Sequence, residues 1–120
     1  MRLAERAVTL ARPAAESPME TRQRLLLVLA GLPEPVPQHE VRDPDGVLIA
    51  RLDLAYPQRR LGIEFDGSGH ADPRQWRADL RRQNALLRAG WRLLRFTAAD
   101  VYRHPGTVVA QVRAALATAA

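Results

Sequence analysis

The 120-residue chain contains no cysteine, and it has no apolar run long enough to span a membrane. The absence of cysteine excludes disulfides, cysteine nucleophiles and thiolate metal sites. The first residues, "MRLAERAVTLARPAAE", carry charged residues among the apolar ones and make a poor signal peptide. We therefore expect a cytoplasmic protein with one domain over residues 17–120, preceded by a tail or linker at residues 1–16.

Lysine is also absent, so arginine supplies all 18 basic residues, and the formal net charge is +5. A GC-rich genome accounts for arginine in place of lysine, but it does not account for the excess of positive charge. Guanidinium groups bind phosphate through two hydrogen bonds at once. The composition therefore favours a phosphate-rich partner.

The first half of the chain predicts one helix followed by three strands. A capping sequence that begins at Ser17 predicts a helix ending at Gly31. Residues 37–57 predict a hairpin that turns at residues 43–46, because proline presets one dihedral there and glycine allows a positive one. The third predicted strand covers residues 61–66.

The second half predicts a long helix between the cap Asp72 and Gly90, a fourth strand at residues 91–96, and helices beginning at Thr97 and near Pro105. The apolar positions of the long helix predict an inner stripe of Trp76, Leu80, Ala85 and Leu87. Because that helix is a crossover, the strands that it joins should be parallel. We expect an α/β fold with a mixed four-stranded central sheet flanked by helices, in the order α-β-β-β-α-β-α.

Acidic residues occupy one face of the second and third strands. Alternation predicts that Leu52 and Leu54 share one face while Asp53 points the other way, and that Glu64 and Asp66 point away from the apolar side of their strand. The strands are joined by a short connection and should pair as antiparallel neighbours, with facing side chains about 5 Å apart. Asp53 and Glu64 can therefore meet on one face.

Two chemical interpretations of this acid pair remain open. Carboxylates this close raise each other's pKa unless a cation lies between them. Mg²⁺ binds carboxylate oxygens and retains waters, so a metal bound there could orient a water and stabilise charge on a phosphoryl oxygen. Alternatively, the acids line a solvated sheet face, as is common in half-exposed antiparallel strands.

The segments "ARLDLAYPQRRLGIEFDGSGH" and "GWRLLRFTAADV", with the arginine-rich helix between them, resemble a domain family allied to the very-short-patch-repair (Vsr) endonucleases. These enzymes belong to the PD-(D/E)XK nuclease superfamily. The resemblance covers roughly residues 17–118. It implies a restriction-endonuclease-like fold and an endonuclease that hydrolyses DNA phosphodiester bonds with Mg²⁺ or Mn²⁺, without an organic cofactor.

The resemblance also assigns roles to individual residues. Asp53 matches the family's metal-binding aspartate and Glu64 the acid of the (D/E)XK element, and the two would hold the metal. Glu20 matches the acid that many relatives contribute from the first helix, and it would complete the metal's shell directly or through water. A capping box explains Glu20 equally well. His70 falls near the histidines of Vsr-like enzymes and could serve as acid or base. Asp66 stands where the superfamily usually has lysine, and it could position a metal or a water.

The departure at Asp66 supports a second interpretation, a catalytically silent nucleic-acid-binding or regulatory module on the same fold. Under either interpretation the basic residues near the acids are candidates for nucleic-acid contacts. The candidates are Arg74, Arg77, Arg81, Arg82 and Arg95. The alternatives are a solvated helix face for the first four and internal neutralisation of the acids for Arg95.

Overall fold

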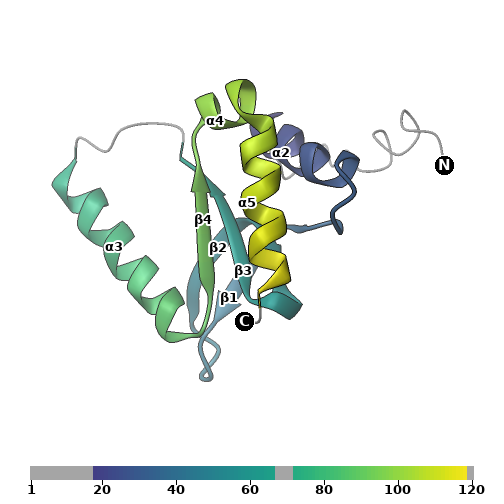
Figure 1. Ribbon diagram of the computed structural model, residues 1–120. Helices are drawn as coiled ribbons and strands as arrows, with labels where there is room; N and C mark the ends of the chain where they lie inside the picture. The colour runs from purple at the N-terminus through teal and green to yellow at the C-terminus, as the bar shows by residue number, and fades with distance from the viewer. Residues whose placement is uncertain (1–17, 67–71, 119–120) are drawn as a thin grey trace.

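A computed structural model describes residues 18–66 and 72–118. The elements are α2 (Pro18–Leu29), β1 (Val36–Arg42), β2 (Leu48–Tyr56), the 3-10 helix η1 (Pro57–Arg59), β3 (Leu61–Phe65), α3 (Pro73–Arg88), β4 (Arg92–Phe96), α4 (Ala98–Arg103) and α5 (Pro105–Ala117) (Figure 1). Every helix and strand predicted within these ranges is present. No helix among the described residues is long and apolar enough to cross a membrane.

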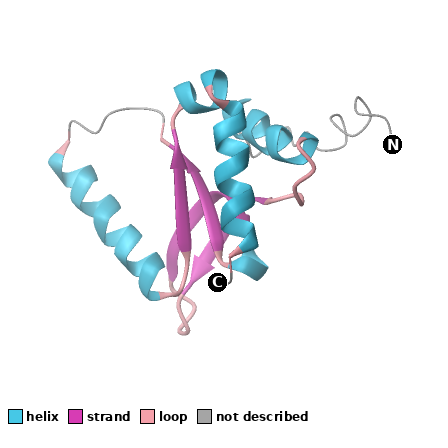
Figure 2. Ribbon diagram, viewed as in Figure 1, coloured by secondary structure: helices cyan, strands magenta, loops and turns pink. Residues whose placement is uncertain are grey.

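The four strands form one mixed sheet in the order β1-β2-β3-β4 (Figure 2). The β1–β2 and β2–β3 pairs are antiparallel, and the β3–β4 pair is parallel. Ile63 lies at the centre of the sheet, because it pairs with Leu54 on one side and Leu94 on the other. The structure thus confirms the predicted α/β class, the mixed sheet and the parallel crossover through α3.

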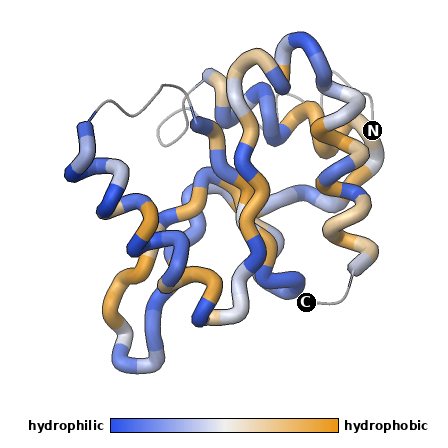
Figure 3. Tube along the Cα trace, turned by 60° about the vertical axis from the view of Figure 1, so that its left-hand side comes forward, coloured by the Kyte–Doolittle hydropathy of each residue, from blue (hydrophilic) through white to orange (hydrophobic). Residues whose placement is uncertain are grey.

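Helices cover both faces of the sheet, with α3 on one side and α2 and α5 on the other (Figure 1). On the α5 side, buried residues of both helices and three strands form one cluster that includes Leu27, Leu54, Ile63, Phe96 and Val112. On the α3 side, a second cluster includes Val41, Ala50, Leu52, Leu86 and Trp91. The start of α3 is hydrophilic (Figure 3). The buried apolar residue that α3 contributes to this cluster, Leu86, lies near its end.

The predicted inner stripe of α3 is wrong. Trp76, Leu80 and Leu87 are 54%, 38% and 59% exposed, whereas Leu86 is fully buried. The side of the helix turned to the sheet carries Asp79 and Arg82 together with Leu86, at the i, i+3, i+7 spacing of one helix face. Charge pairing with the sheet, rather than apolar burial alone, therefore determines which side of α3 faces inward.

The predicted single apolar face of β2 is also wrong. Leu52 belongs to the cluster beneath α3, but Leu54 belongs to the cluster beneath α5. The register of β1 with β2 runs from Pro37↔Leu54 to His39↔Leu52, with Gln38 and Asp53 between these pairs, and Gln38 has a left-handed φ of 51°. A non-glycine residue in this region is unusual and bends the strand locally. The alternation of β2 therefore changes face at Asp53.

The predicted turn at residues 43–46, the cap Asp72 and the helix start at Thr97 are confirmed. Gly46 has a φ of 84°, and its N–H donates to the Asp43 carbonyl at 2.9 Å, which closes the hairpin turn. The Asp72 carboxylate accepts a hydrogen bond from the Arg74 N–H at the start of α3, at 2.9 Å. At the start of α4, Thr97 and Asp100 form a reciprocal capping box. These local contacts hold the ends of the elements that surround the acid pair.

Candidate active site

Asp53 and Glu64 meet on one face of β2 and β3, as predicted, although Leu52, which was expected on the opposite face from Asp53, lies on this side as well. The two strands pair from Tyr56↔Leu61 to Leu54↔Ile63, and one further step of this register places Asp53 opposite Glu64. The Asp53 Oδ2 accepts a hydrogen bond from the Phe65 N–H at 2.8 Å. The Asp53 carboxylate thus replaces a main-chain carbonyl as the hydrogen-bond acceptor for the Phe65 N–H. This contact fixes the Asp53 side chain against the end of β3.

Glu64 is 7% exposed, and its counter-ion is Arg82 of α3. The Arg82 Nη2 lies 2.7 Å from Glu64 Oε1 and 2.7 Å from Glu64 Oε2. A single nitrogen therefore bridges both oxygens of the carboxylate. Charge-assisted contacts of this length are among the stronger hydrogen bonds in proteins.

Two further residues extend this contact into a network. The Arg95 Nη2 lies 2.7 Å from Asp79 Oδ1 and 3.7 Å from Glu64 Oε1. The Arg82 Nη2 lies 3.4 Å from the same Asp79 Oδ1. We call Asp53, Glu64, Asp79, Arg82 and Arg95 the acid–arginine network. It joins α3 to β2, β3 and β4 on one face of the sheet.

The carboxyl groups of this network differ in their electrostatics. Burial raises the pKa of Asp53, and the Phe65 N–H and the arginines oppose that shift. Burial likewise raises the pKa of Glu64, the contact with Arg82 opposes it, and the charge of Asp53 adds a smaller increase. The hydrogen bond from Arg95 lowers the pKa of Asp79. The two desolvated acids on the strands therefore depend on neighbouring cations, while Asp79 is held ionised.

The described acids offer few ligands for the divalent cation that the resemblance implies. Within residues 18–66 and 72–118, no group of three or more His, Asp or Glu side chains is placed to hold a metal ion. Asp53 and Glu64 form a pair, and Mg²⁺ commonly binds one or two carboxylates while it retains several waters. Asp53 and Glu64 would supply two carboxylates to such an ion, and Glu64 would have to release Arg82 for the ion to bind.

Glu20 of α2 contacts β1. Its Oε2 accepts a short hydrogen bond from the Nε2 of Gln38 on β1. Glu20 thus binds a residue of β1, and among the described residues it is not gathered into one ligand set with the acid pair. Ser17, the other half of the predicted capping box, lies outside the described residues.

Asp66 and His70 follow the end of β3. The Asp66 N–H donates to the Phe96 carbonyl at 2.8 Å, which extends the pairing of β3 with β4 by one step. The charge of Asp66 contributes to a raised pKa of Arg95, after the larger effect of Asp79. Asp66 therefore lies near the acid–arginine network. His70 lies outside the described residues.

The predicted nucleic-acid-binding arginines divide into two groups. Arg74, Arg77 and Arg81 are exposed on α3. Arg82 and Arg95 are partly buried, with side-chain exposures of 26% and 29%, and both contact acids of the network. Internal neutralisation, which was the alternative interpretation for Arg95, thus describes the resting contacts of both residues.

Sequence analysis did not identify Asp79 or Gln38 as part of this region, and it did not single out the buried amide of Gln23 on α2. The i, i+3 spacing of Asp79 and Arg82 was the available signal for Asp79. Gln23 lies one helical turn after Glu20 and is fully buried, and its Nε2 and Oε1 have no hydrogen-bond partner among the described residues. Buried unpaired amides are uncommon, but no sequence pattern distinguishes them in advance.

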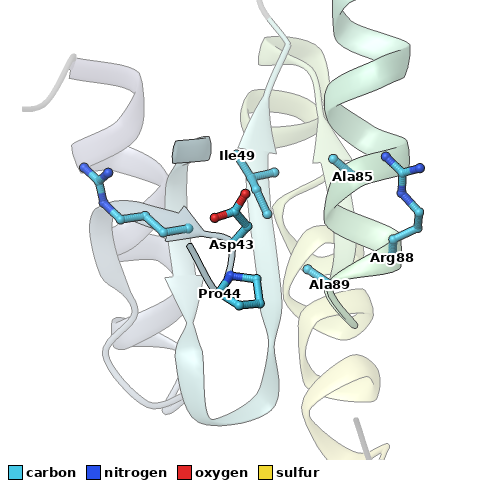
Figure 4. Close-up of a pocket in the computed structure, with 7 residues that line it drawn as sticks. Asp43, Pro44, Ile49, Ala85, Arg88 and Ala89 are labelled. Atoms are coloured by element: carbon cyan, nitrogen blue, oxygen red, sulfur yellow. The ribbon is translucent and has the colours of Figure 1, made fainter. Parts of the chain in front are cut away.

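Two grooves border α3. One, of about 570 Å³, lies between the β1–β2 hairpin and the end of α3 (Figure 4). Neither Asp53 nor Glu64 lines it. Its lining residues are Arg42, Asp43, Pro44, Ile49, Ala85, Arg88 and Ala89. The other, of about 300 Å³, is lined by Gln83, Leu87, Leu93 and Arg95. The second groove therefore reaches the acid–arginine network from the side of β4.

Comparison with known proteins identifies the family. The family model REase_MTES_1575 matches residues 38–116, from β1 into α5. The uncharacterized proteins MT2308 and Rv2248, from two strains of Mycobacterium tuberculosis, are each 34% identical to the chain over 99 residues. The matched region covers 82% of this chain and 36% of each relative, so the chain spans about a third of their length. No solved structure matches significantly. The family match and the mixed sheet flanked by helices lead to one conclusion: the chain belongs to the restriction-endonuclease-like family REase_MTES_1575.

Proposed function

We propose that this domain is an endonuclease that hydrolyses DNA phosphodiester bonds with Mg²⁺ or Mn²⁺ bound at Asp53 and Glu64. The observation that carries the proposal is the pair of desolvated carboxylates on adjacent strands, within a chain of a restriction-endonuclease-like family. We further assign the chain to the Vsr-related branch of the PD-(D/E)XK superfamily. The positions of Asp53 on β2 and Glu64 on β3 support this assignment.

The site residues have distinct roles in this proposal. A divalent cation held by these residues would act as a Lewis acid, which would activate a water and offset charge on the phosphoryl group. Asp53, which the Phe65 N–H holds in place, and Glu64 contribute the ligand oxygens. Glu20 positions Gln38 beside Asp53 through their hydrogen bond. Asp66 and His70 act on the protons of the attacking and leaving oxygens.

Binding of the DNA backbone is assigned to exposed arginines of α3. Arg74, Arg77 and Arg81 lie on the helix that carries Arg82 into the acid–arginine network. Arginine contacts to phosphate position a duplex without reading its sequence. The excess of positive charge in the chain agrees with this use.

A silent nucleic-acid-binding module is the second candidate function. One observation favours it specifically, because both oxygens of Glu64 are held by Arg82 in the described structure. The absence of lysine from the chain points in the same direction. In this case the network would be a structural salt bridge between α3 and the sheet.

Cleavage assays separate the two functions. The 120-residue chain is incubated with supercoiled and single-stranded DNA and Mg²⁺ or Mn²⁺, beside Asp53→Ala, Glu64→Ala and the matched control Asp45→Ala. Asp45 is an exposed acid of the hairpin turn, so its variant makes the same charge change away from the site. We expect metal-dependent nicking that falls at least about 100-fold in the first two variants only. Binding without nicking on every substrate would establish the silent module instead.

A further inference from the structure

Arg82 contacts three carboxylate oxygens through one nitrogen. Its Nη2 lies 2.7 Å from each oxygen of Glu64 and 3.4 Å from Asp79 Oδ1. A divalent cation held by Glu64 would use these same two carboxylate oxygens as ligands. Arg82 and a divalent cation therefore compete for the same oxygens of Glu64.

The environment of Glu64 makes a counter-charge necessary. Its side chain is 10% exposed and lies opposite Asp53. Removing one partner of such a pair leaves a buried charge uncompensated, which is costly. The other nearby cation, Arg95, is 3.7 Å from Glu64 and is engaged with Asp79 at 2.7 Å. Arg82 is thus the principal cation on Glu64 among the described residues.

A second partner for Arg82 is already in place. Asp79 lies one helical turn before Arg82 on α3, so the pair has the i, i+3 spacing at which helix side chains meet. An ionised carboxylate accepts several hydrogen bonds through its two oxygens, so Asp79 can retain Arg95 and receive Arg82 as well. The guanidinium can therefore leave Glu64 without losing every ionic partner.

We propose that Arg82 is an internal counter-ion that holds Glu64 in the resting site, and that binding of a divalent cation to Asp53 and Glu64 transfers its guanidinium to Asp79. The proposal rests on the metal site of the proposed function. It assigns to Arg82 a positioning role, because in the resting site this residue keeps the carboxylate ionised and oriented, and it ties metal affinity to a residue of α3.

Calorimetric titration with MnCl₂ at pH 8 tests the exchange directly, without reference to cleavage. Arg82→Gln removes the competing charge and should bind Mn²⁺ at least about ten-fold more tightly than the wild type, given the strength of a charge-assisted contact. Arg88→Gln makes the same charge change at an exposed position of the same helix and should stay within about two-fold. Arg82→Lys retains a cation and should stay closer to the wild type than Arg82→Gln.

The variant Asp79→Asn tests whether Asp79 receives the Arg82 guanidinium when the metal binds. Without the Asp79 charge, Arg82 should leave Glu64 less readily, so Mn²⁺ affinity should fall a few-fold below that of the wild type, by about the size of an exposed ion pair. In the double variant Asp79→Asn/Arg82→Gln this decrease should disappear, because no guanidinium remains to be transferred.

The outcomes distinguish this proposal from the proposed function. If the wild type binds Mn²⁺ but Arg82→Gln binds no more tightly than Arg88→Gln, the exchange is overturned while the metal site stands. If neither the wild type nor any variant with an intact Asp53–Glu64 pair binds Mn²⁺, both proposals are overturned. Circular dichroism of each variant, and the Arg82→Lys result, separate loss of the contact from loss of the fold.

Discussion

On the α5 side of the sheet, Leu54 and Ile63 lie in an apolar cluster with Leu27 of α2, whereas their chain neighbours Asp53 and Glu64 meet charged side chains beneath α3. The same two strands thus provide an apolar layer on one face, and on the other face they place the acid pair beside the apolar cluster that includes Leu52. Burial of apolar area stabilises the first face without directional requirements. The second face depends on pairing each desolvated charge. This division lets one face hold the fold while the other retains groups that can change partners.

The largest expected effect is a loss of stability from a substitution in the apolar cluster beneath α5. Leu27 is fully buried, and Leu27→Ala should lower the free energy of unfolding by about 2–5 kcal/mol through lost burial and the cavity left behind. The matched control is Leu87→Ala on α3, where the side chain is 59% exposed and the change should stay within about 0.5 kcal/mol. Urea denaturation of both variants measures the difference, and equal losses would contradict the division between the faces.

Glu64 and Asp79 should contribute to folding stability with opposite dependences on pH. Glu64 has a pKa raised above its ordinary value of 4.5, so the folded state binds its proton more tightly than the unfolded state. Its contribution to stability is therefore present below pH 4.5 and is lost as pH rises through the folded pKa. Asp79 has a pKa below its ordinary value of 3.8, so its contribution is present above pH 3.8 and is lost as pH falls.

Two substitutions isolate these contributions. Relative to the wild type, Glu64→Gln should gain stability as pH rises above about 4.5, because the cost of ionising a buried group is removed. Asp79→Asn should show the opposite trend, with its relative loss of stability diminishing as pH falls below about 4. Urea denaturation from pH 3 to pH 8 provides the comparison. Parallel curves for the two variants would show that the acids do not differ in this way.

The smallest expected effect concerns DNA binding and again compares the faces. Arg77→Gln on α3 should weaken DNA binding a few-fold at low salt and reduce the slope of log affinity against log salt by about 1. Arg113 on α5 is also exposed, and its Nη2 donates to the Ala30 carbonyl at 3.2 Å on the other side of the sheet. Arg113→Gln should leave the slope unchanged. Fluorescence anisotropy measures the affinity of both variants for DNA between about 50 and 200 mM salt, the range in which phosphate contacts weaken. A larger loss for Arg113→Gln would place the DNA on the α5 face.

Much of the fold could be predicted from local patterns. The turn at Asp43 to Gly46, the cap at Asp72 and the capping box at Thr97 each involve residues within a few positions of one another. The acid pair could also be predicted, since a period of two and a short connection determine which residues of adjacent strands face each other. By contrast, the change of face between Leu52 and Leu54 depends on the left-handed Gln38 of a neighbouring strand.

The sequence by itself therefore determined the order of the elements, the parallel crossover and the opposition of Asp53 and Glu64. Only the tertiary structure decided that Arg82, 18 positions beyond Glu64, is its counter-ion, and that Arg95 turns to Asp79. The reason is that these contacts depend on how α3 is rotated about its axis over the sheet. That rotation brings Leu86 into the core and Asp79 and Arg82 over the strands, against the apolar pattern that the isolated helix presents.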